Sequence, residues 1–395
     1  MELKFLKNAE TLTVILPETI DTTNAVEVEE SLLNVIESNK PFSELVFNAE
    51  KLSYISSVGL RVMLRVKKEN DSLVINDVNS DVYDVFEMTG FTEIIDIKKA
   101  LRRVSVEGCK VIGEGFYGRV YRLSPDTIVK VFFRGGTLED VDRERRLAKT
   151  AFVLGVPTAI SYDVVKTVEE GKVCYGSVFE LLDCASLKAL VLNDLDHLDK
   201  YLKMHSDLIE KINSTIVPSK DLPYSLDATK DWLDVIKKNN IFDDETFNKI
   251  VKLVNTIPNI DNMVHGDCHV KNILVQNGEP LLIDMDTLSK GHRIFEFAGI
   301  YLCYIAYELT EPGNCLSFLG VDPNVCKKIY YGVLKNIYAD KSEKELEEIQ
   351  AKIEILACVL FLFRQILYSP ENTLRREFCV KKLKEGIERF ETLEF

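Results

Sequence analysis

HGDCHVKN at residues 265–272 and LLIDMD at residues 281–286 are the two segments from which the fold of this sequence follows. Asp267 and Asn272 are five residues apart on one predicted loop, and Asp284 comes twelve residues later, in an apolar run that predicts a strand. Phosphoryl transfer from a nucleotide needs one carboxylate to accept or orient the attacking hydroxyl, and an amide and a second carboxylate to hold Mg²⁺ on the phosphates. The full spacing therefore indicates phosphoryl transfer, whereas His-Gly-Asp alone would be weak evidence.

An upstream glycine motif agrees with this interpretation. VIGEGFYGRVY at residues 111–121 contains G-x-G-x-x-G, formed by Gly113, Gly115 and Gly118. Strand-forming residues flank the glycines on both sides, which predicts a hairpin and not the start of a helix as in a dinucleotide site. Without side chains in the way, such a hairpin can close over phosphates.

A lysine and a glutamate complete the pattern. Lys130 lies inside the apolar run 128–132, where it can pair with the α- and β-phosphates, and Glu144, in the helical run 139–152, is its predicted partner. Taken singly, the glycine loop could be an ordinary turn, Lys130 an edge-strand lysine and Glu144 part of a solvated helix face. The four elements in this order predict a kinase-type fold.

From residue 108 to about residue 390 the sequence resembles the aminoglycoside phosphotransferase and choline kinase branch of the protein-kinase-like superfamily. The resemblance implies that Asp267 is the catalytic aspartate and that Asn272 and Asp284 are the metal ligands. It also implies that Lys130 contacts the phosphates, with Glu144 as its ion-pair partner.

The same resemblance implies where the nucleotide binds. Gly113, Gly115 and Gly118 would form the phosphate-covering loop, and the segment 179–182 would be the hinge between lobes, where the backbone of Glu180 and Leu182 meets the base. Asp286, two residues after the implied metal ligand, is either a metal-assisting acid or a polar loop residue.

The short segment between Asp284 and Glu296 bears on which class of acceptor is phosphorylated. Glu296 follows Asp284 by twelve residues, and Asp-Phe-Gly, Ala-Pro-Glu and His-Arg-Asp are all absent from the sequence, so little chain is available for a peptide-binding platform. A helical insert at 186–259 and the helices after Phe295 could instead wall a small-molecule pocket. We expect Mg²⁺-dependent transfer of the γ-phosphate of ATP or GTP to a hydroxyl of a small molecule such as an aminoglycoside, choline or a sugar.

The first hundred residues have a different pattern. Apolar runs at 14–16, 44–47 and 72–75 predict strands, and residues 24–37 and 81–88 predict helices. Their order predicts a mixed sheet with helices packed on it. Together with Ile-Ser-Ser-Val-Gly-Leu-Arg at 55–61, this pattern resembles the STAS domain of bacterial anti-anti-sigma factors.

The STAS resemblance implies a regulatory serine. In that family a serine two residues before the glycine, here Ser57, is reversibly phosphorylated and switches the binding of a protein partner. An aspartate often precedes that serine, and this sequence has Ser56 there. A phosphate on Ser57 would be stabilised by the amides and dipole of the helix that begins at this point. The alternative is that Ser56 and Ser57 only cap the helix.

The expected architecture is therefore α/β followed by α+β. A STAS-like domain at 1–100 and a linker at 101–107 precede a bilobal kinase-like fold, with a β-rich N-lobe at 108–182 and a mostly helical C-lobe at 183–395. Two other functions stay open. The kinase-like part could phosphorylate Ser57 in cis, or a STAS partner in trans, or it could be a nucleotide-binding scaffold without turnover.

The composition limits the classes of partner that we expect this protein to bind. The 395 residues carry a net charge of −14, which disfavours nucleic acid as a general partner and is compatible with cationic substrates or simply with solubility. Nine scattered cysteines are typical of free thiols in a reducing compartment, and neither a signal peptide nor a membrane-spanning run is evident. We therefore expect a cytoplasmic protein without a membrane partner.

Overall fold

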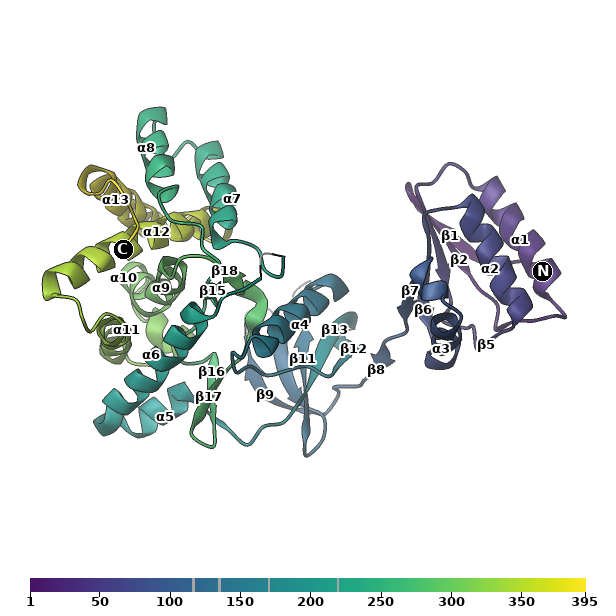
Figure 1. Ribbon diagram of the computed structural model, residues 1–395, viewed down its shortest axis with the longest axis horizontal. Helices are drawn as coiled ribbons and strands as arrows, with labels where there is room; N and C mark the ends of the chain where they lie inside the picture. Colours follow the sequence, from purple (N-terminus) through teal and green to yellow (C-terminus); the bar gives the residue numbers. More distant parts are fainter. Residues whose placement is uncertain (116–117, 134–135, 170, 219) are drawn as a thin grey trace. The chain divides into compact units, whose positions relative to one another are not determined.

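The structure is a computed structural model, and it describes residues 1–115, 118–133, 136–169, 171–218 and 220–395. The chain forms two compact units, Met1–Ser105 and Val106–Phe395, and each unit has its own hydrophobic core (Figure 1). In the described parts of the chain, no helix combines the length and the apolar character needed to cross a bilayer.

The N-terminal unit is built on a mixed sheet. Its strands are ordered β1 (Phe5–Lys7), β2 (Thr11–Ile15), β4 (Glu44–Asn48), β6 (Leu73–Val78) and β7 (Asp96–Lys99). β1 runs antiparallel to β2, and the other neighbours are parallel. A second, short parallel pair is formed by β3 (Thr19–Ile20) and β5 (Tyr54–Ile55). The predicted mixed sheet is confirmed.

Helices cover this sheet. α1 (Ala25–Ser38) and α2 (Ser57–Glu69) pack against each other, and α3 (Ser80–Met88) is followed by the short helix η1 (Phe91–Glu93) (Figure 1). Side chains at spacings of four residues, such as Val28, Leu32 and Ile36, put one face of α1 into the core.

The start of α2 depends on two small residues. The hydroxyl oxygen of Ser56 accepts a hydrogen bond from the backbone N–H of Gly59 at 3.4 Å and caps the helix, while Ser57 is its exposed first residue. A Cβ on Gly59 would lie 2.6 Å from the carbonyl oxygen of Ile20, so only glycine allows this close approach.

The sequence predicts the boundary between domains within 96–108, where Lys98 and Lys99 interrupt the apolar pattern, but this segment begins with regular structure. Residues 96–99 form β7, an edge strand of the sheet, in which Ile97 is 8% exposed. Both lysines are exposed while Ile97 between Asp96 and Lys98 points into the core, as expected for a half-buried strand. β8 (Arg102–Arg103) follows.

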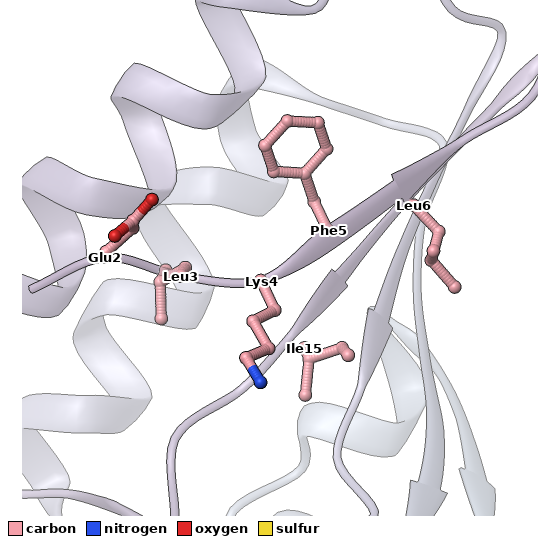
Figure 2. A pocket seen from close by; sticks show the side chains of 6 residues that line it. All are labelled: Glu2, Leu3, Lys4, Phe5, Leu6 and Ile15. Atoms are coloured by element: carbon pink, nitrogen blue, oxygen red, sulfur yellow. The ribbon is translucent and has the colours of Figure 1, made fainter.

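A hollow lies at the N-terminal edge of this unit. Figure 2 shows the side chains that line it, which come from residues 2–6 and from Ile15 of β2. Phe5 and Leu6 are exposed there, and Glu2 and Lys4 supply the polar atoms. None of the residues to which the sequence assigns chemistry lies in this hollow.

The C-terminal unit begins with a β-rich N-lobe. Its strands and helix are β9 (Lys110–Glu114), β10 (Gly118–Arg122), β11 (Thr127–Phe132), α4 (Leu138–Val153), β12 (Asp163–Glu169) and β13 (Lys172–Glu180). The strands lie in the antiparallel order β12–β13–β11–β10–β9. Thr137 and Asp140 form a capping box that starts α4.

The C-lobe is mostly helical. Its elements are β14 (Ala185–Ser186), α5 (Leu187–Asn193), η2 (Leu195–His197), α6 (Leu198–Ser214), α7 (Ser225–Lys238), α8 (Asp244–Val254), β15 (Met263–Val264), β16 (Ile273–Gln276), β17 (Glu279–Leu282), η3 (Met285–Thr287), β18 (Ser289–Lys290), α9 (Ile294–Tyr301), η4 (Leu302–Ala306), α10 (Tyr307–Thr310), η5 (Cys315–Leu319), α11 (Pro323–Ile337), α12 (Glu343–Tyr368) and α13 (Thr373–Arg389). The helices α7, α9 and α13 pack against the long α12 (Figure 1). The expected bilobal architecture is confirmed.

Candidate active site

The predicted catalytic loop connects β15 to β16. At its centre, the amide nitrogen of Asn272 donates to the backbone oxygen of Asp267 and to its carboxylate Oδ2, both at 3.0 Å. The structure thus brings together the first acid and the amide of the motif. Because the nitrogen of the Asn272 amide is bound to Asp267, its oxygen is the atom left for another ligand.

The second acid of the motif, Asp284, forms an ion pair with the N-lobe lysine, Lys130. Lys130 on β11 donates to Oδ1 of Asp284 at 2.7 Å and to the two carboxylate oxygens of Glu144 on α4 at 2.8 and 3.1 Å. Burial alone would lower the pKa of Lys130, but the two carboxylates raise it above its ordinary value. Lys130 is therefore a permanent cation that joins the N-lobe to the C-lobe.

The backbone at Asp284 is unusual. Its φ angle of 65° lies in the left-handed region, which non-glycine residues seldom adopt and which is concentrated at functional sites. Burial alone would raise the pKa of the Asp284 carboxyl, but the ammonium of Lys130 lowers it below its ordinary value. Asp284 is consequently an anion at neutral pH that contacts Lys130 of the N-lobe.

Asp286 lies near the same cluster. Burial, together with repulsion from Asp284 and Glu144, raises the pKa of Asp286 to about 7. Both roles that the sequence leaves open for Asp286, a metal-assisting acid and a polar loop residue, are compatible with this position.

The glycine-rich segment forms the predicted hairpin between β9 and β10. The backbone N–H of Gly115 donates to the carbonyl oxygen of Gly118 at 2.9 Å, and Gly113 lies within β9. A Cβ on Gly118 would lie 2.6 Å from the carbonyl oxygen of Val131, so this position requires glycine. Residues 116 and 117 lie outside the described residues.

The predicted hinge connects the lobes. Glu180 ends β13, and the backbone N–H of Leu181 donates to the carbonyl oxygen of Asp126 at 2.7 Å. Leu182 is half-buried in the extended segment that leads to β14. The chain therefore leaves the sheet of the N-lobe at Glu180 and enters the first helix of the C-lobe at Leu187.

Comparison with known proteins identifies the two units. Residues 108–313, just over half of the chain, match the model of the phosphotransferase enzyme family. The chain belongs to this family. Residues 2–104 match the STAS domain model. The putative anti-sigma factor antagonist BtrV of Bordetella bronchiseptica is 32% identical over 82 residues, which are 20% of this chain and 69% of that protein.

Several solved structures are similar to this chain. The apo form of a thermostable mutant of aminoglycoside phosphotransferase APH(4)-Ia has a TM-score of 0.44 and 12% identity, and the match covers 76% of this chain and 98% of the other. ADP-bound aminoglycoside phosphotransferase APH(2'')-Ib has a TM-score of 0.44 and 16% identity, with 77% and 96% covered.

In the phosphotransferase domain, the oxygen atoms near the lobe boundary fit a hard cation. Mg²⁺ prefers carboxylate and amide oxygens, and Asn272 offers its amide oxygen while Asp284 offers a carboxylate. A softer metal would need a different set. Asp267, His269 and Cys303 place three ligand atoms within 4.8 Å of one another. Zinc binds sets of this kind, with imidazole and thiolate ligands, whereas Asn272 and Asp284 supply the oxygen ligands that Mg²⁺ prefers and could hold that ion.

The catalytic loop is stabilised by Glu296, a residue that the sequence did not single out as functional. Glu296 on α9 is fully buried, and its carboxylate accepts hydrogen bonds from the backbone N–H groups of His265 at 2.7 Å and Gly266 at 3.2 Å. Burial raises the pKa of Glu296, although His265 and these amides act in the other direction. A Cβ on Gly299, one turn along α9, would lie 2.0 Å from the carbonyl oxygen of Gly266. The loop is therefore seated directly on this helix.

Other side chains fix the rest of the loop. The Thr287 hydroxyl donates to the carbonyl oxygen of His265 at 2.6 Å, and the Tyr304 hydroxyl accepts from the backbone N–H of Val270 at 2.9 Å. Tyr304 belongs to the π-helical segment η4. The apolar run at 298–307 predicts a buried helix, but it does not indicate that part of this helix deviates from α-helical geometry.

His205 on α6 supports the loop from a third side. Its Nε2 donates to the carbonyl oxygen of Cys268 at 2.7 Å, since a carbonyl can only accept. The side chain is buried, and burial lowers its pKa to about 4. The folded protein thus keeps His205 neutral, whereas the unfolded chain takes up a proton near pH 6.5.

We expect the stability of the phosphotransferase domain to fall as the pH drops from 6.5 towards 4, because only the unfolded state binds a proton at His205 in this window. The contribution is present in full above pH 6.5 and amounts to at most about 3 kcal/mol. His205→Gln, which keeps an N–H donor, should remove this part of the pH dependence. Denaturant unfolding at several pH values measures it, with His197→Gln at an exposed histidine as the control. Parallel pH profiles for wild type and His205→Gln would contradict the assignment.

Proposed function

We propose that the phosphotransferase domain is a kinase that transfers the γ-phosphate of ATP to a hydroxyl group of a small molecule. The observation that carries this proposal is the two contacts Lys130–Asp284 and Asn272–Asp267, which supply a cation, two candidate oxygen ligands for Mg²⁺ and a carboxylate. The STAS domain would be its regulatory, partner-binding part.

The geometry assigns a task to each side chain. Lys130, held by Glu144, would bind the α- and β-phosphates. Asp267 would orient the acceptor hydroxyl and take its proton as the oxygen attacks the γ-phosphorus and the bond to the ADP oxygen breaks. Bound Mg²⁺, held by Asn272 and Asp284, would supply neutralisation of the phosphate charge.

One oxygen of Asp267 is better suited to receive the proton. Oδ2 accepts a hydrogen bond from the Asn272 amide, so its position is fixed, whereas among the described residues Oδ1 has only the weak thiol contact of Cys303 at 3.6 Å. The Asp267 side chain is one-third exposed. The acceptor would therefore approach Oδ1, on the side of the loop away from Asn272.

A small acceptor agrees with the short chain between the metal ligand and the next helix. Only η3 and β18 lie between Asp284 and α9, which begins at Ile294. These elements leave little backbone for a peptide-binding platform, and α5–α8 occupy the predicted insert at 186–259. ATP is the proposed donor, with GTP as the alternative, read by the backbone at Glu180 and Leu182.

Two substitutions should separate chemistry from nucleotide binding. Asp267→Asn should lower phosphoryl transfer at least a hundredfold and leave Mg-ATP affinity within about twofold, because the proton acceptor acts only in the reaction. Asp284→Asn should weaken Mg-ATP binding about tenfold or more, because a charged ligand is lost. ADP release and calorimetric titration measure the two effects, with Asp227→Asn at a surface ion pair as control. Normal turnover in Asp267→Asn, or unchanged affinity in Asp284→Asn, would contradict these roles.

A signalling role is the second candidate, and one observation favours it. Ser57 is exposed at the first position of α2, where a phosphate would be stabilised by free amides and the helix dipole. The domain could then phosphorylate its own STAS serine, or a partner's, as a switch for partner binding.

Since the phosphotransferase domain offers little platform for a peptide, we expect no phosphate on Ser56 or Ser57 after incubation of the full chain with Mg-ATP. Phosphopeptide mass spectrometry measures this directly, and the Asp267→Asn variant shows whether any phosphate found depends on the active site. Phosphoserine at Ser57 in the wild type and not in Asp267→Asn would favour the signalling function over the small-molecule function.

A further inference from the structure

We propose that Asp267, His269 and Cys303 form a second metal site, which takes Zn²⁺, and that an ion bound there inhibits phosphoryl transfer. The site is distinct from the oxygen ligands Asn272 and Asp284 proposed for Mg²⁺. Binding of the ion follows from the geometry and chemistry of the three side chains alone, whereas its inhibitory effect rests on the kinase function proposed above.

The three side chains converge on one small space. One ligand atom from each of them lies within 4.8 Å of the other two. The sulfur of Cys303 lies 3.6 Å from Oδ1 of Asp267, and Nε2 of His269 lies 3.6 Å from Oδ2 of the same carboxylate. In a tetrahedral zinc site, bonds of about 2.0–2.3 Å put neighbouring ligand atoms about 3.4–3.6 Å apart. The two contacts of Asp267 therefore already have the spacing of zinc ligands.

The ligand types select zinc over magnesium. Zn²⁺ binds imidazole nitrogen, thiolate sulfur and carboxylate oxygen, whereas Mg²⁺ prefers oxygen alone. In the metal-free protein, Cys303 is a thiol that donates to Asp267. When zinc binds, the S–H bond breaks, a Zn–S bond forms and the proton goes to solvent. Three protein ligands leave the fourth tetrahedral position for water, as in open zinc sites.

His269 is a buried polar side chain that lacks hydrogen bonds. It is 3% exposed, and among the described residues its Nδ1 has no partner, while the 3.6 Å from Nε2 to Asp267 exceeds hydrogen-bond length. A buried nitrogen without a partner is unfavourable. The imidazole packs edge-on against Phe318, with centroids 5.5 Å apart, which restricts the orientation of the ring. A metal ion between these side chains would give Nε2 a partner.

The two segments that carry the ligands are joined directly beside the site. The hydroxyl of Tyr304, adjacent to Cys303, accepts a hydrogen bond at 2.9 Å from the backbone N–H of Val270, which is adjacent to His269. Within the loop, the backbone N–H of His269 donates to the carbonyl oxygen of Asp267 at 2.8 Å. Spacing along the chain does not reveal the site, because Cys303 is 36 residues from Asp267.

An ion in this site would block the proposed proton acceptor. The Asp267 side chain is one-third exposed, whereas His269 and Cys303 are buried, so the ion would enter from the side of Asp267. Oδ1, the oxygen proposed to receive the proton, is the one that contacts Cys303. A carboxylate bound to a dication is a poor proton acceptor. We therefore expect zinc to stop the transfer step without preventing the binding of Mg-ATP.

The first test measures metal binding and needs no turnover. Co²⁺, a spectroscopic substitute for zinc, is added to the fully reduced full chain in excess Mg²⁺. We expect a thiolate-to-cobalt charge-transfer band in the near ultraviolet. Cys303→Ser should remove this band, with Cys303→Ala as a second variant, and His269→Gln should weaken cobalt binding about tenfold or more.

Matched controls are Cys109→Ser and His197→Gln, at a thiol and an imidazole outside the cluster. Both controls should keep the charge-transfer band of the wild type. Thermal unfolding without metal shows whether each variant folds.

The second test measures inhibition. ADP release from saturating Mg-ATP, with water as the acceptor, is followed as Zn²⁺ is added, and each variant is compared with its own zinc-free rate. In the wild type, excess Mg²⁺ should not relieve the inhibition. Cys303→Ser and His269→Gln should raise the zinc concentration for half-inhibition about tenfold or more, and the two controls should match the wild type.

Several results would overturn this proposal. They are the absence of a thiolate band with Co²⁺ in the wild type, a band that Cys303→Ser leaves unchanged, activation by Zn²⁺, and inhibition that excess Mg²⁺ relieves or that neither cluster variant changes. Absence of ADP release from the zinc-free wild type would instead contradict the kinase function and remove the inhibitory role with it, while the cobalt band would still decide whether the metal site exists.

Discussion

The ion pairs of the Lys130 ammonium group are the interactions on which the phosphotransferase domain depends. Lys130 lies on a strand of the N-lobe and contacts one carboxylate from α4 and another from the strand end of the C-lobe. A buried cation of this kind is costly unless it is fully paired, and removing one partner leaves a buried charge. Under the proposed kinase function, the same three groups that bring the lobes together would also prepare the site for phosphates, because Lys130 would exchange a carboxylate for a phosphate oxygen.

The catalytic loop is rigid for a different reason. Glu296, His205 and Thr287 each form a hydrogen bond with its backbone. The loop also packs against α9 at Gly299, where the close approach leaves no room for a side chain. The Asp267 side chain extends from this supported backbone, and its Oδ2 accepts a hydrogen bond from Asn272. Under the proposed kinase function, preorganisation of this kind would lower the free-energy cost of aligning the acceptor hydroxyl with the phosphate.

The spacing of the motif residues predicts those members of the candidate site that are close together in the sequence. Asp267, Asn272 and Asp284 lie on neighbouring loops, so their order alone indicates the chemistry. Glu296 and His205 were not identified, because each reaches the site from a helix whose pattern of apolar residues is explained by the core. The π-helical turn that presents Cys303 and Tyr304 likewise has no signature in an apolar run. In the STAS domain, β7 was assigned to the boundary because its two exposed lysines mask a single inward side chain, Ile97.

The most direct test of this account is a double-mutant cycle between Lys130→Met and Glu144→Gln, read as the dissociation constant of Mg-AMP-PNP by calorimetry. If Glu144 acts by holding Lys130, each single substitution weakens binding about tenfold or more, and the double variant binds no more weakly than Lys130→Met, a coupling of at least about 1 kcal/mol. Independent, multiplicative effects, or unchanged affinity in Lys130→Met, would contradict the claim that this ion cluster organises the nucleotide site.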